Sequence, residues 1–178
     1  TTTARLIAKA LNCQKNDNEQ IKCSSEKFCP SCEEIISSNH IDILEMDAAS
    51  KTGIDDIREL IESSKYSPTS AKYKIFIIDE VHMLSKQAFN GLLKTLEEPP
   101  PSLKFILATT EVRKIPVTIL SRCQRFDLKR VNVEELCKHL KNISLKEDGK
   151  ISDNAIKLIA RTSEGSVRDA ISLLDRAF

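Results

Sequence analysis

The stretch KIFIIDEVHML, from Lys74 to Leu84, decides how this chain folds. Its short, uninterrupted apolar run, Ile75 to Ile78, is typical of a parallel strand that is buried on both faces. Asp79 and Glu80 follow at the carboxyl end of that strand, where open α/β sheets bind their ligands. One carboxylate there can hold Mg²⁺ through its water shell and the next can orient an attacking water, as nucleotide hydrolysis requires. The alternative is a solvated acidic turn, and the rest of the chain has to decide.

Composition limits the possible classes of protein. A length of 178 residues allows one domain, or one domain with a small appendage. The 27 basic residues nearly balance the 26 acidic ones, so there is no polybasic footprint for nucleic acid, and any DNA contact would be local or shared among subunits. No apolar stretch approaches the roughly 18 residues of a membrane span, and no signal peptide is recognisable. We therefore expect a cytoplasmic protein without membrane contacts.

Strands and helices alternate over residues 1–129. Such alternation predicts an α/β fold, a parallel sheet flanked by helices. Ser50 and Ser85 are available as N-caps, and Pro99-Pro100-Pro101 ends the helix that follows Ser85. The predicted strands cover 41–47, 75–78, 104–110 and 124–128, and the predicted helices cover 2–11, 54–61, 89–96 and a short link at 115–120.

The pattern changes near Lys129, after which only helices are indicated. Apolar residues recur at helical spacing over 133–143, 152–162 and 167–177, with Ser152 and Ser166 as N-caps. Three successive helices predict a small bundle. We therefore predict two domains, 1–129 and 130–178.

Four cysteines fall within a polar insertion at 12–34, in the pattern C-x₉-C-x₅-C-x₂-C: Cys13, Cys23, Cys29 and Cys32. Four thiolates satisfy tetrahedral zinc and leave no open position, which predicts a structural site. Disulfides would require export, and an iron–sulfur cluster would require a redox task that no other residue supports. A zinc ribbon that binds nucleic acid would need more basic and aromatic residues than this insertion holds.

Thr110 and His82 are candidates near the carboxylate pair. Thr110 ends the second buried strand, so its hydroxyl could reach a phosphate or an attacking water beside Glu80; the alternative is a cap for the next turn. His82 follows the carboxylates by two residues, and a role there competes with simple packing.

Two arginines are weaker candidates. Arg122 lies between a short helix and a predicted strand, where it can pair with a local carboxylate or project towards a neighbouring molecule's nucleotide. Arg168 lies in the first turn of the last helix. Helix starts prefer acids to cations, so an arginine there hints at an anionic ligand.

Five strings resemble the AAA+ clamp-loader family, in the family's own order: IFIIDEVHMLS, LLKTLEEPP, KFILATT, PVTILSRCQRFDL and GSVRDAISLLD. With the four-cysteine insertion, the resemblance is to gamma/tau clamp-loader subunits of bacterial DNA polymerase III. It implies a P-loop NTPase fold with a zinc-binding insertion and a three-helix lid. It also implies a motor that uses ATP and Mg²⁺ to load a sliding clamp on primed DNA, within a hetero-oligomeric ring of clamp-loader subunits and, in a long form, with the polymerase core.

The resemblance also implies roles for individual residues. Asp79 matches the magnesium-water ligand and Glu80 the catalytic carboxylate of the Walker B pair. The remaining matches are Thr110 as sensor 1, Arg122 as an arginine finger acting in trans, Arg168 as sensor 2, and Cys13, Cys23, Cys29 and Cys32 as zinc ligands, with a longer spacing than the family's.

The amino end departs from the family. The family's P-loop reads G-x-x-G-x-G-K-T, and this chain starts at its threonine, so Thr1 matches the Mg²⁺ ligand and Thr2 follows at the helix start. The glycines and lysine that cradle the phosphates are missing, so we expect a fragment that binds ATP poorly. The alternative is a non-catalytic, delta-prime-like subunit that supplies an arginine finger and a scaffold. The intact Asp79-Glu80 pair favours the ATPase.

Overall fold

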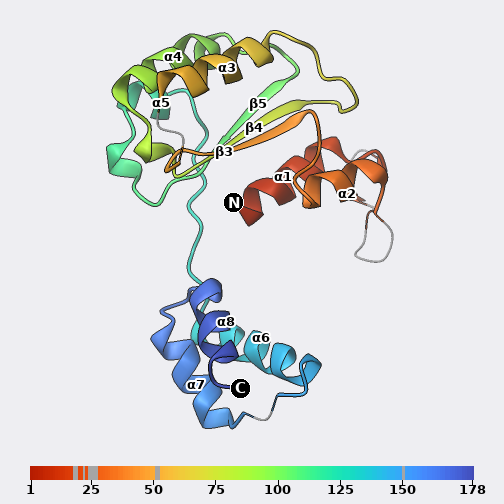
Figure 1. The fold of residues 1–178 in the computed structure, drawn as a ribbon, viewed down its shortest axis with the longest axis vertical. Coiled ribbons are helices and arrows are strands. Elements are labelled where there is room, and N and C mark those ends of the chain that lie inside the picture. Colours follow the sequence, from red (N-terminus) through yellow and green to blue (C-terminus); the bar gives the residue numbers. More distant parts are fainter. Residues whose placement is uncertain (18–19, 22, 24–27, 51–52, 150) are drawn as a thin grey trace. The chain divides into compact units, whose positions relative to one another are not determined.

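The computed structural model describes residues 1–17, 20–21, 23, 28–50, 53–149 and 151–178. The chain separates into two compact units, Thr1–Arg125 and Phe126–Phe178, and each is described by itself (Figure 1). The sequence placed the boundary between residues 129 and 130. No helix of the described residues is long and apolar enough to cross a membrane.

A three-stranded parallel sheet organises the first unit. Its strands lie in the order β3 (Ile43–Asp47), β4 (Lys74–Asp79) and β5 (Leu103–Leu107). The central strand β4 is the predicted one, and its residues from Ile75 to Ile78 are all 0% exposed. In the ladder Asp47 lies opposite Asp79, and Ile78 lies opposite Leu107. The predicted parallel sheet is confirmed.

Helices cover both faces of the sheet, because successive side chains of a strand point to opposite sides (Figure 1). Ile75 and Ile77 pack with residues of α1 (Thr2–Asn12) and α2 (Pro30–Ile36). Phe76 and Ile78 pack with residues of α3 (Ile54–Ser64), α4 (Lys86–Glu97) and α5 (Val117–Leu120). The sheet is therefore the middle layer of three.

One of the two predicted N-caps of the first unit differs from the structure. Ser85 does cap α4 by accepting from the Ala88 N–H, but Ser50 caps no helix. Its hydroxyl donates to Asp47 at 2.9 Å, and α3 begins after Gly53 instead. The short side chain of Ser50 satisfies a turn at the end of β3, which competes with capping.

The predicted strand over 124–128 is wrong. Residues 124–132 form neither helix nor strand. A strand requires a neighbour that pairs with its amides and carbonyls, and the described sheet, with the order β3-β4-β5, does not include this segment. The alternating apolar side chains of this segment also pack against no core of the described residues, since Phe126 is 71% and Leu128 74% exposed.

The second unit is a bundle of three helices, as the sequence predicted: α6 (Val133–Lys146), α7 (Asp153–Thr162) and α8 (Val167–Asp175). Ser152 and Ser166 cap α7 and α8 through hydrogen bonds from backbone amides. The helices share a separate buried core, which includes Leu136, Leu140, Ile156, Ala160, Ala170 and Leu174.

Short elements complete the first unit. The insertion contains a two-stranded antiparallel pair, β1 (Asn16–Asp17) and β2 (Gln20–Ile21). Two 3₁₀ turns, η1 (Val81–Met83) and η2 (Val112–Lys114), follow β4 and β5. Both turns lie at the carboxyl edge of the sheet, where the candidate site is found.

Candidate functional site

The two predicted carboxylates lie at the carboxyl end of the central strand. Asp79 is the last residue of β4, and Glu80 is the residue just before η1. Glu80 has φ 47°, in the left-handed region, which costs a non-glycine residue about 1–3 kcal/mol and is concentrated at functional sites. The backbone on both sides is fixed: Ala48 N–H donates to the Asp79 carbonyl and Val81 N–H to the Ala108 carbonyl, both at 2.9 Å. Neighbouring segments thus impose this conformation.

Asp79 is held in its charged form. Its carboxylate accepts from the Thr1 hydroxyl, lies 3.5 Å from the Thr1 ammonium, and accepts from the Glu80 N–H at 3.1 Å. Burial acts to raise the pKa of Asp79, but the Thr1 hydroxyl, the ammonium charge and the Glu80 amide together bring that pKa below its ordinary value. Carboxylate and hydroxyl oxygens are the protein ligands that Mg²⁺ prefers. Thr1 and Asp79 therefore fit such an ion.

Glu80 is engaged through one of its oxygens. Its Oε2 accepts from the Thr110 hydroxyl at 3.1 Å and lies 3.3 Å from Nδ1 of His82. Within the described residues, Oε1 makes no hydrogen bond. The structure therefore brings Thr110 next to Glu80, as the strand ends predicted, and brings Thr1, which was a candidate through the family resemblance, next to Asp79.

The other predicted site residues lie elsewhere. Arg122 follows α5, donates to the Thr118 carbonyl and pairs with Glu97, both at 2.6 Å. In this structure Arg122 therefore pairs with a carboxylate of its own chain, which is one of the two possibilities that the sequence left open. Thr2 is exposed in the first turn of α1, and Arg168 is exposed at the second position of α8 in the other unit.

The four cysteines of the insertion form a compact cluster. All four are buried, and their Sγ atoms lie within 4.8 Å of one another, with Cys13 and Cys23 at 3.4 Å. A tetrahedral zinc ion with bonds of about 2.3 Å needs sulfurs about 3.8 Å apart, so the cluster fits this ion. Helix ends position three of the cysteines: Cys13 follows the end of α1, and Cys29 and Cys32 lie at the start of α2.

The cluster also favours at least one thiolate. Burial opposes charge on Cys29, but the backbone amides of Cys32 and Gln14 lower the pKa of the Cys29 thiol to about 6. Burial raises the pKa of Cys32 and of Cys13. A cation would reverse this second effect, because a coordinated thiol is deprotonated.

Sequence reasoning missed the polar groups that anchor the insertion. Ser31, between the paired cysteines, donates to the Asn12 carbonyl at 3.4 Å and lies 3.2 Å from Nε2 of His40. The opposite ring nitrogen, Nδ1, accepts from the Asp42 N–H at 3.1 Å. All four of these residues are buried. No spacing rule identifies them, since their contacts depend on how α2 packs on the sheet.

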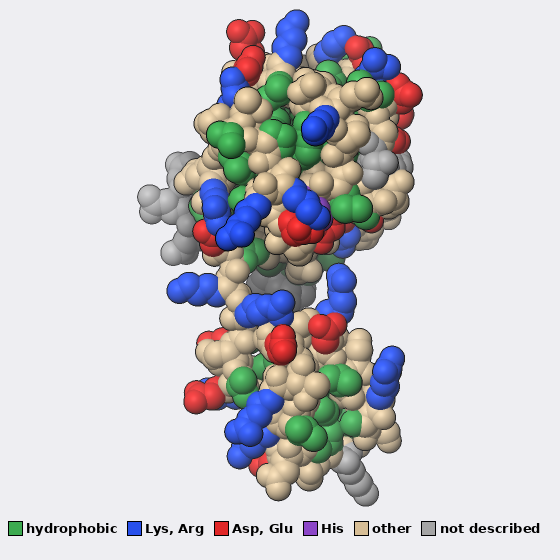
Figure 2. All heavy atoms as spheres, turned by 90° about the vertical axis from the view of Figure 1, so that its left-hand side faces the viewer, with side chains coloured by type: hydrophobic (Ala, Val, Ile, Leu, Met, Phe, Trp, Pro, Cys, Tyr) green, Lys and Arg blue, Asp and Glu red, His purple; other side chains and the backbone are tan. Residues whose placement is uncertain are grey.

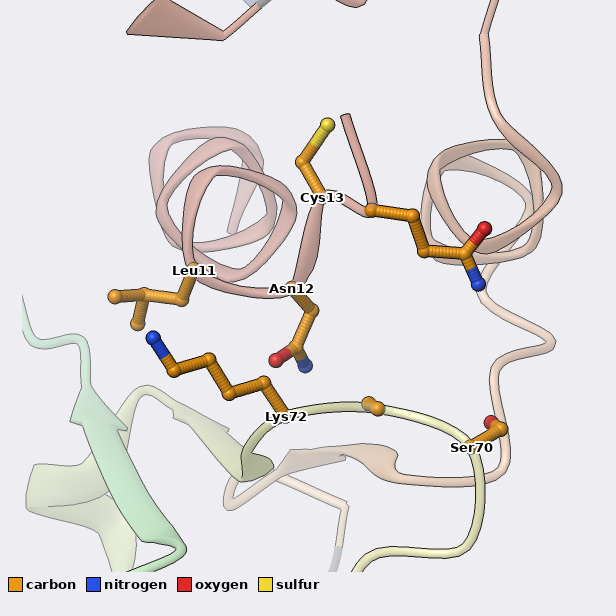
Figure 3. Close-up of a pocket in the computed structure, with 7 residues that line it drawn as sticks. Leu11, Asn12, Cys13, Ser70 and Lys72 are labelled. Carbon is orange, nitrogen blue, oxygen red and sulfur yellow. The ribbon is translucent and has the colours of Figure 1, made fainter. Parts of the chain in front are cut away.

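A cavity of about 290 Å³ lies between the end of α1 and the loop at 70–72, away from the carboxylates (Figure 3). Asn12 points towards that loop, whereas Cys13 points away from it (Figure 3). The Asn12 side chain makes two hydrogen bonds with the backbone of Tyr73, at 2.8 and 2.9 Å. The cavity therefore belongs to the junction between insertion and sheet.

Figure 2 shows basic and acidic side chains interspersed on the viewed face, without a large area of one sign. This agrees with the near balance of charge in the sequence.

The fold and the edge of the sheet define a P-loop NTPase of the AAA+ class. In solved structures, a similar fold occurs in a gamma subunit-related protein of DNA polymerase III from Thermotoga maritima, with TM-score 0.59 and 28% identity over 80% of this chain and 47% of that chain. The Holliday junction branch migration motor RuvB of the same organism has TM-score 0.63 and 24% identity over 80% of this chain and 47% of its own, which is a likeness of fold.

Family comparisons place the chain more narrowly. Residues 1–132 match the family described as DNA polymerase III, delta subunit, and residues 135–178 match the DNA polymerase III clamp loader subunit, ATPase lid domain. Over 99% of this chain, identity is 47% to the tau subunit of Escherichia coli and 49% to the gamma/tau subunit of Mycoplasma genitalium. The chain covers 27% and 29% of those two relatives. It belongs to the gamma/tau family of DNA polymerase III clamp-loader subunits.

Proposed function

We propose that the full-length protein hydrolyses ATP as the motor subunit of the clamp loader and uses that hydrolysis to load a sliding clamp on primed DNA. The observation that carries the proposal is the meeting of Asp79, Glu80, Thr1 and Thr110 at the carboxyl edge of a parallel sheet. Other clamp-loader subunits, the clamp and primed DNA are the partners, with the polymerase core as a further partner of a long form.

Each residue has a distinct chemical task in this proposal. Asp79 would hold Mg²⁺ together with the hydroxyl of Thr1, which already donates to its carboxylate. The ion, when bound, neutralises charge that develops on the phosphates. Glu80 has one oxygen held by Thr110 and uses the other to orient the attacking water and accept its proton. Thr110 links the position of Glu80 to the state of the γ-phosphate.

Arg122 is proposed to act on nucleotide that is bound to a neighbouring subunit. In this chain it pairs with Glu97, and both side chains are partly exposed. An exposed ion pair contributes only about 0–1 kcal/mol, so a phosphate group can replace the Glu97 carboxylate at little cost. Arg168 is proposed to contact nucleotide as sensor 2, on the strength of the sequence resemblance. The cysteine cluster is proposed to hold structural zinc.

The test is Glu80→Gln in the full-length subunit, assembled with its partners. The amide keeps the size of the side chain and loses its basicity, so we expect ATP binding to persist and turnover to fall at least 10²-fold, the low end of what general-base catalysis contributes. Steady-state hydrolysis and equilibrium ATP binding measure the two quantities. Turnover equal to that of the unaltered protein would remove Glu80 from catalysis.

A second candidate is a subunit that supplies Arg122 and a scaffold without hydrolysing ATP. The match of residues 1–132 to the family described as the delta subunit favours it. The intact carboxylate pair favours the ATPase. Absence of hydrolysis in the assembled complex with only this subunit's site intact would support the second candidate.

A further inference from the structure

His82 is a partly buried histidine between two acidic residues. Its side chain is 7% exposed, and it lies in η1, two residues after the strained residue Glu80. Its Nδ1 lies 3.3 Å from Oε2 of Glu80 and 3.0 Å from the Thr109 hydroxyl, while its Nε2 lies 3.4 Å from Oε1 of Glu111. The ring thus joins the end of β4 to the segment that follows β5.

The segment that follows β5 is itself organised around these contacts. The Thr109 hydroxyl oxygen accepts from the Glu111 N–H at 3.0 Å. The Glu111 carboxylate also pairs with Lys114 at 2.7 Å, so the acidic groups Glu80 and Glu111 and the cation Lys114 are the charges around the ring. Thr110 lies between Thr109 and Glu111 and donates to Glu80. A movement of this segment therefore reaches Glu80 by two routes, one through Thr110 and one through His82.

The chemistry of the imidazole suits a link of this kind. A neutral ring carries one N–H. On Nδ1 this N–H faces Glu80 and the Thr109 hydroxyl, whereas on Nε2 it faces Glu111 and leaves Nδ1 free to accept from the Thr109 hydroxyl. A protonated ring donates to both sides. In either form the ring lies next to Oε2 of Glu80, the same oxygen that accepts from Thr110.

We propose that His82 is a positioning residue for hydrolysis: it fixes the Glu80 carboxylate in the orientation that activates water, and it couples that orientation to the segment Thr109–Glu111. This inference rests on the proposed ATPase function, since it assigns a role with respect to Glu80. His82 touches no reacting atom in this role.

The experiment compares three substitutions in the full-length subunit within its complex. His82→Ala removes both contacts. His82→Asn keeps an N–H near the position of Nδ1 and hence near Glu80, whereas His82→Gln places its amide nearer to Nε2 and Glu111. We expect His82→Ala to lower kcat about 10- to 100-fold, the range for the loss of a group that orients an active-site residue, with KM for ATP unchanged. His82→Asn should recover more activity than His82→Gln.

Two results would overturn the proposal. One is a kcat for His82→Ala equal to that of the unaltered protein. The other is an equal loss in all three variants together with a rise in KM and a lower Tm, which indicates a purely structural role. Glu80→Gln serves as the reference: if it retains full turnover, the ATPase proposal itself has failed. If Glu80→Gln is inactive and His82→Ala is fully active, only the inference about His82 has failed.

Discussion

At the scale of single residues, Asp42 shows how a buried charge can be satisfied without a cation. It is 2% exposed, and its carboxylate accepts from the backbone amides of Thr69, Ser70 and Ala71 at 2.8, 2.8 and 2.9 Å. Burial acts to raise the pKa of Asp42, but these amides and the Ser70 hydroxyl bring it below its ordinary value. Asp42 therefore fixes the loop between α3 and β4, just before the strand that carries the site.

This arrangement predicts a pH dependence of stability. A carboxylate with a lowered pKa in the folded state contributes stability above its unfolded pKa of about 3.9, and this contribution is lost as the pH falls through the folded pKa. Asp42→Asn replaces an acceptor oxygen by an NH₂ group that faces the backbone N–H donors of the loop, so it should lower the free energy of unfolding by about 1–3 kcal/mol at pH 7. The difference from the unaltered chain should shrink below about pH 4.

Urea unfolding of both proteins between pH 3 and 7 measures this difference. Asp55→Asn is a suitable control, because the Asp55 side chain is 88% exposed and pairs with Arg58 across one turn of α3. A difference between Asp42→Asn and the unaltered chain that stays constant over this range of pH would contradict the assignment.

At the scale of elements, the described residues of the insertion form no apolar core besides the cysteine cluster. Its buried cluster consists of the four cysteines with Phe28 packed against them, and Lys9 of α1 lies 3.9 Å from the centre of the Phe28 ring. Such a segment needs another source of order, and structural zinc contributes about 10–16 kcal/mol of apparent binding energy in small domains. The geometry of the cluster makes that ion the expected source.

The prediction for this element concerns metal content. Cys32→Ser should abolish stoichiometric zinc binding, because three thiolates leave the tetrahedral site incomplete. Cys137→Ser, which alters a cysteine of α6 outside the cluster, should leave the content unchanged. Elemental analysis of the purified proteins measures both. Iron in place of zinc, or equal zinc in the two variants, would refute the assignment.

At the scale of the whole molecule, the chain in our proposal holds the parts of more than one active site. It spans about a quarter to a half of the curated relatives that it matches. Asp79 and Glu80 serve its own nucleotide in our proposal, whereas Arg122, paired with Glu97, serves a neighbour's. Activity is then a property of adjacent subunits.

Arg122→Ala tests this division of labour. In the assembled complex it should leave ATP binding by its own subunit intact and slow hydrolysis at the adjacent subunit by about 10³-fold or more, as expected for an arginine finger. Arg113→Ala, at an exposed arginine of η2, is the control. Complexes in which only one subunit carries the change, with single-turnover hydrolysis as readout, locate the defect. Loss of ATP binding in the altered subunit itself would contradict action in trans.

Comparison of sequence and structure shows which kinds of inference succeed. The buried strand at 75–78, the Ser85 cap and the meeting of Glu80 with Thr110 were predictable, because they depend on local patterns and on the shared edge of parallel strands. The prediction of a strand at 124–128 failed, because a strand needs a neighbouring strand to pair with, and the alternation of apolar residues within the segment does not reveal whether one is present.

The contacts of individual side chains were the hardest to predict. The pairing of Arg122 with Glu97 and the position of His82 between Glu80 and Glu111 depend on irregular segments. In these segments no periodicity specifies the direction of a side chain.

The antiparallel placement of α1 beside β4 has a mechanical consequence. The helix is about 16 Å long at 1.5 Å per residue. At one end the Thr1 hydroxyl donates to Asp79, and at the other the Asn12 side chain makes hydrogen bonds with the backbone of Tyr73, next to Cys13 of the cysteine cluster. The helix α1 and the strand β4 are thus linked by hydrogen bonds at both ends, and the cysteine cluster adjoins the end that is farther from the carboxylates. Because α1 is one continuous helix, a displacement of α1 at the cysteine cluster also displaces its other end, at Asp79.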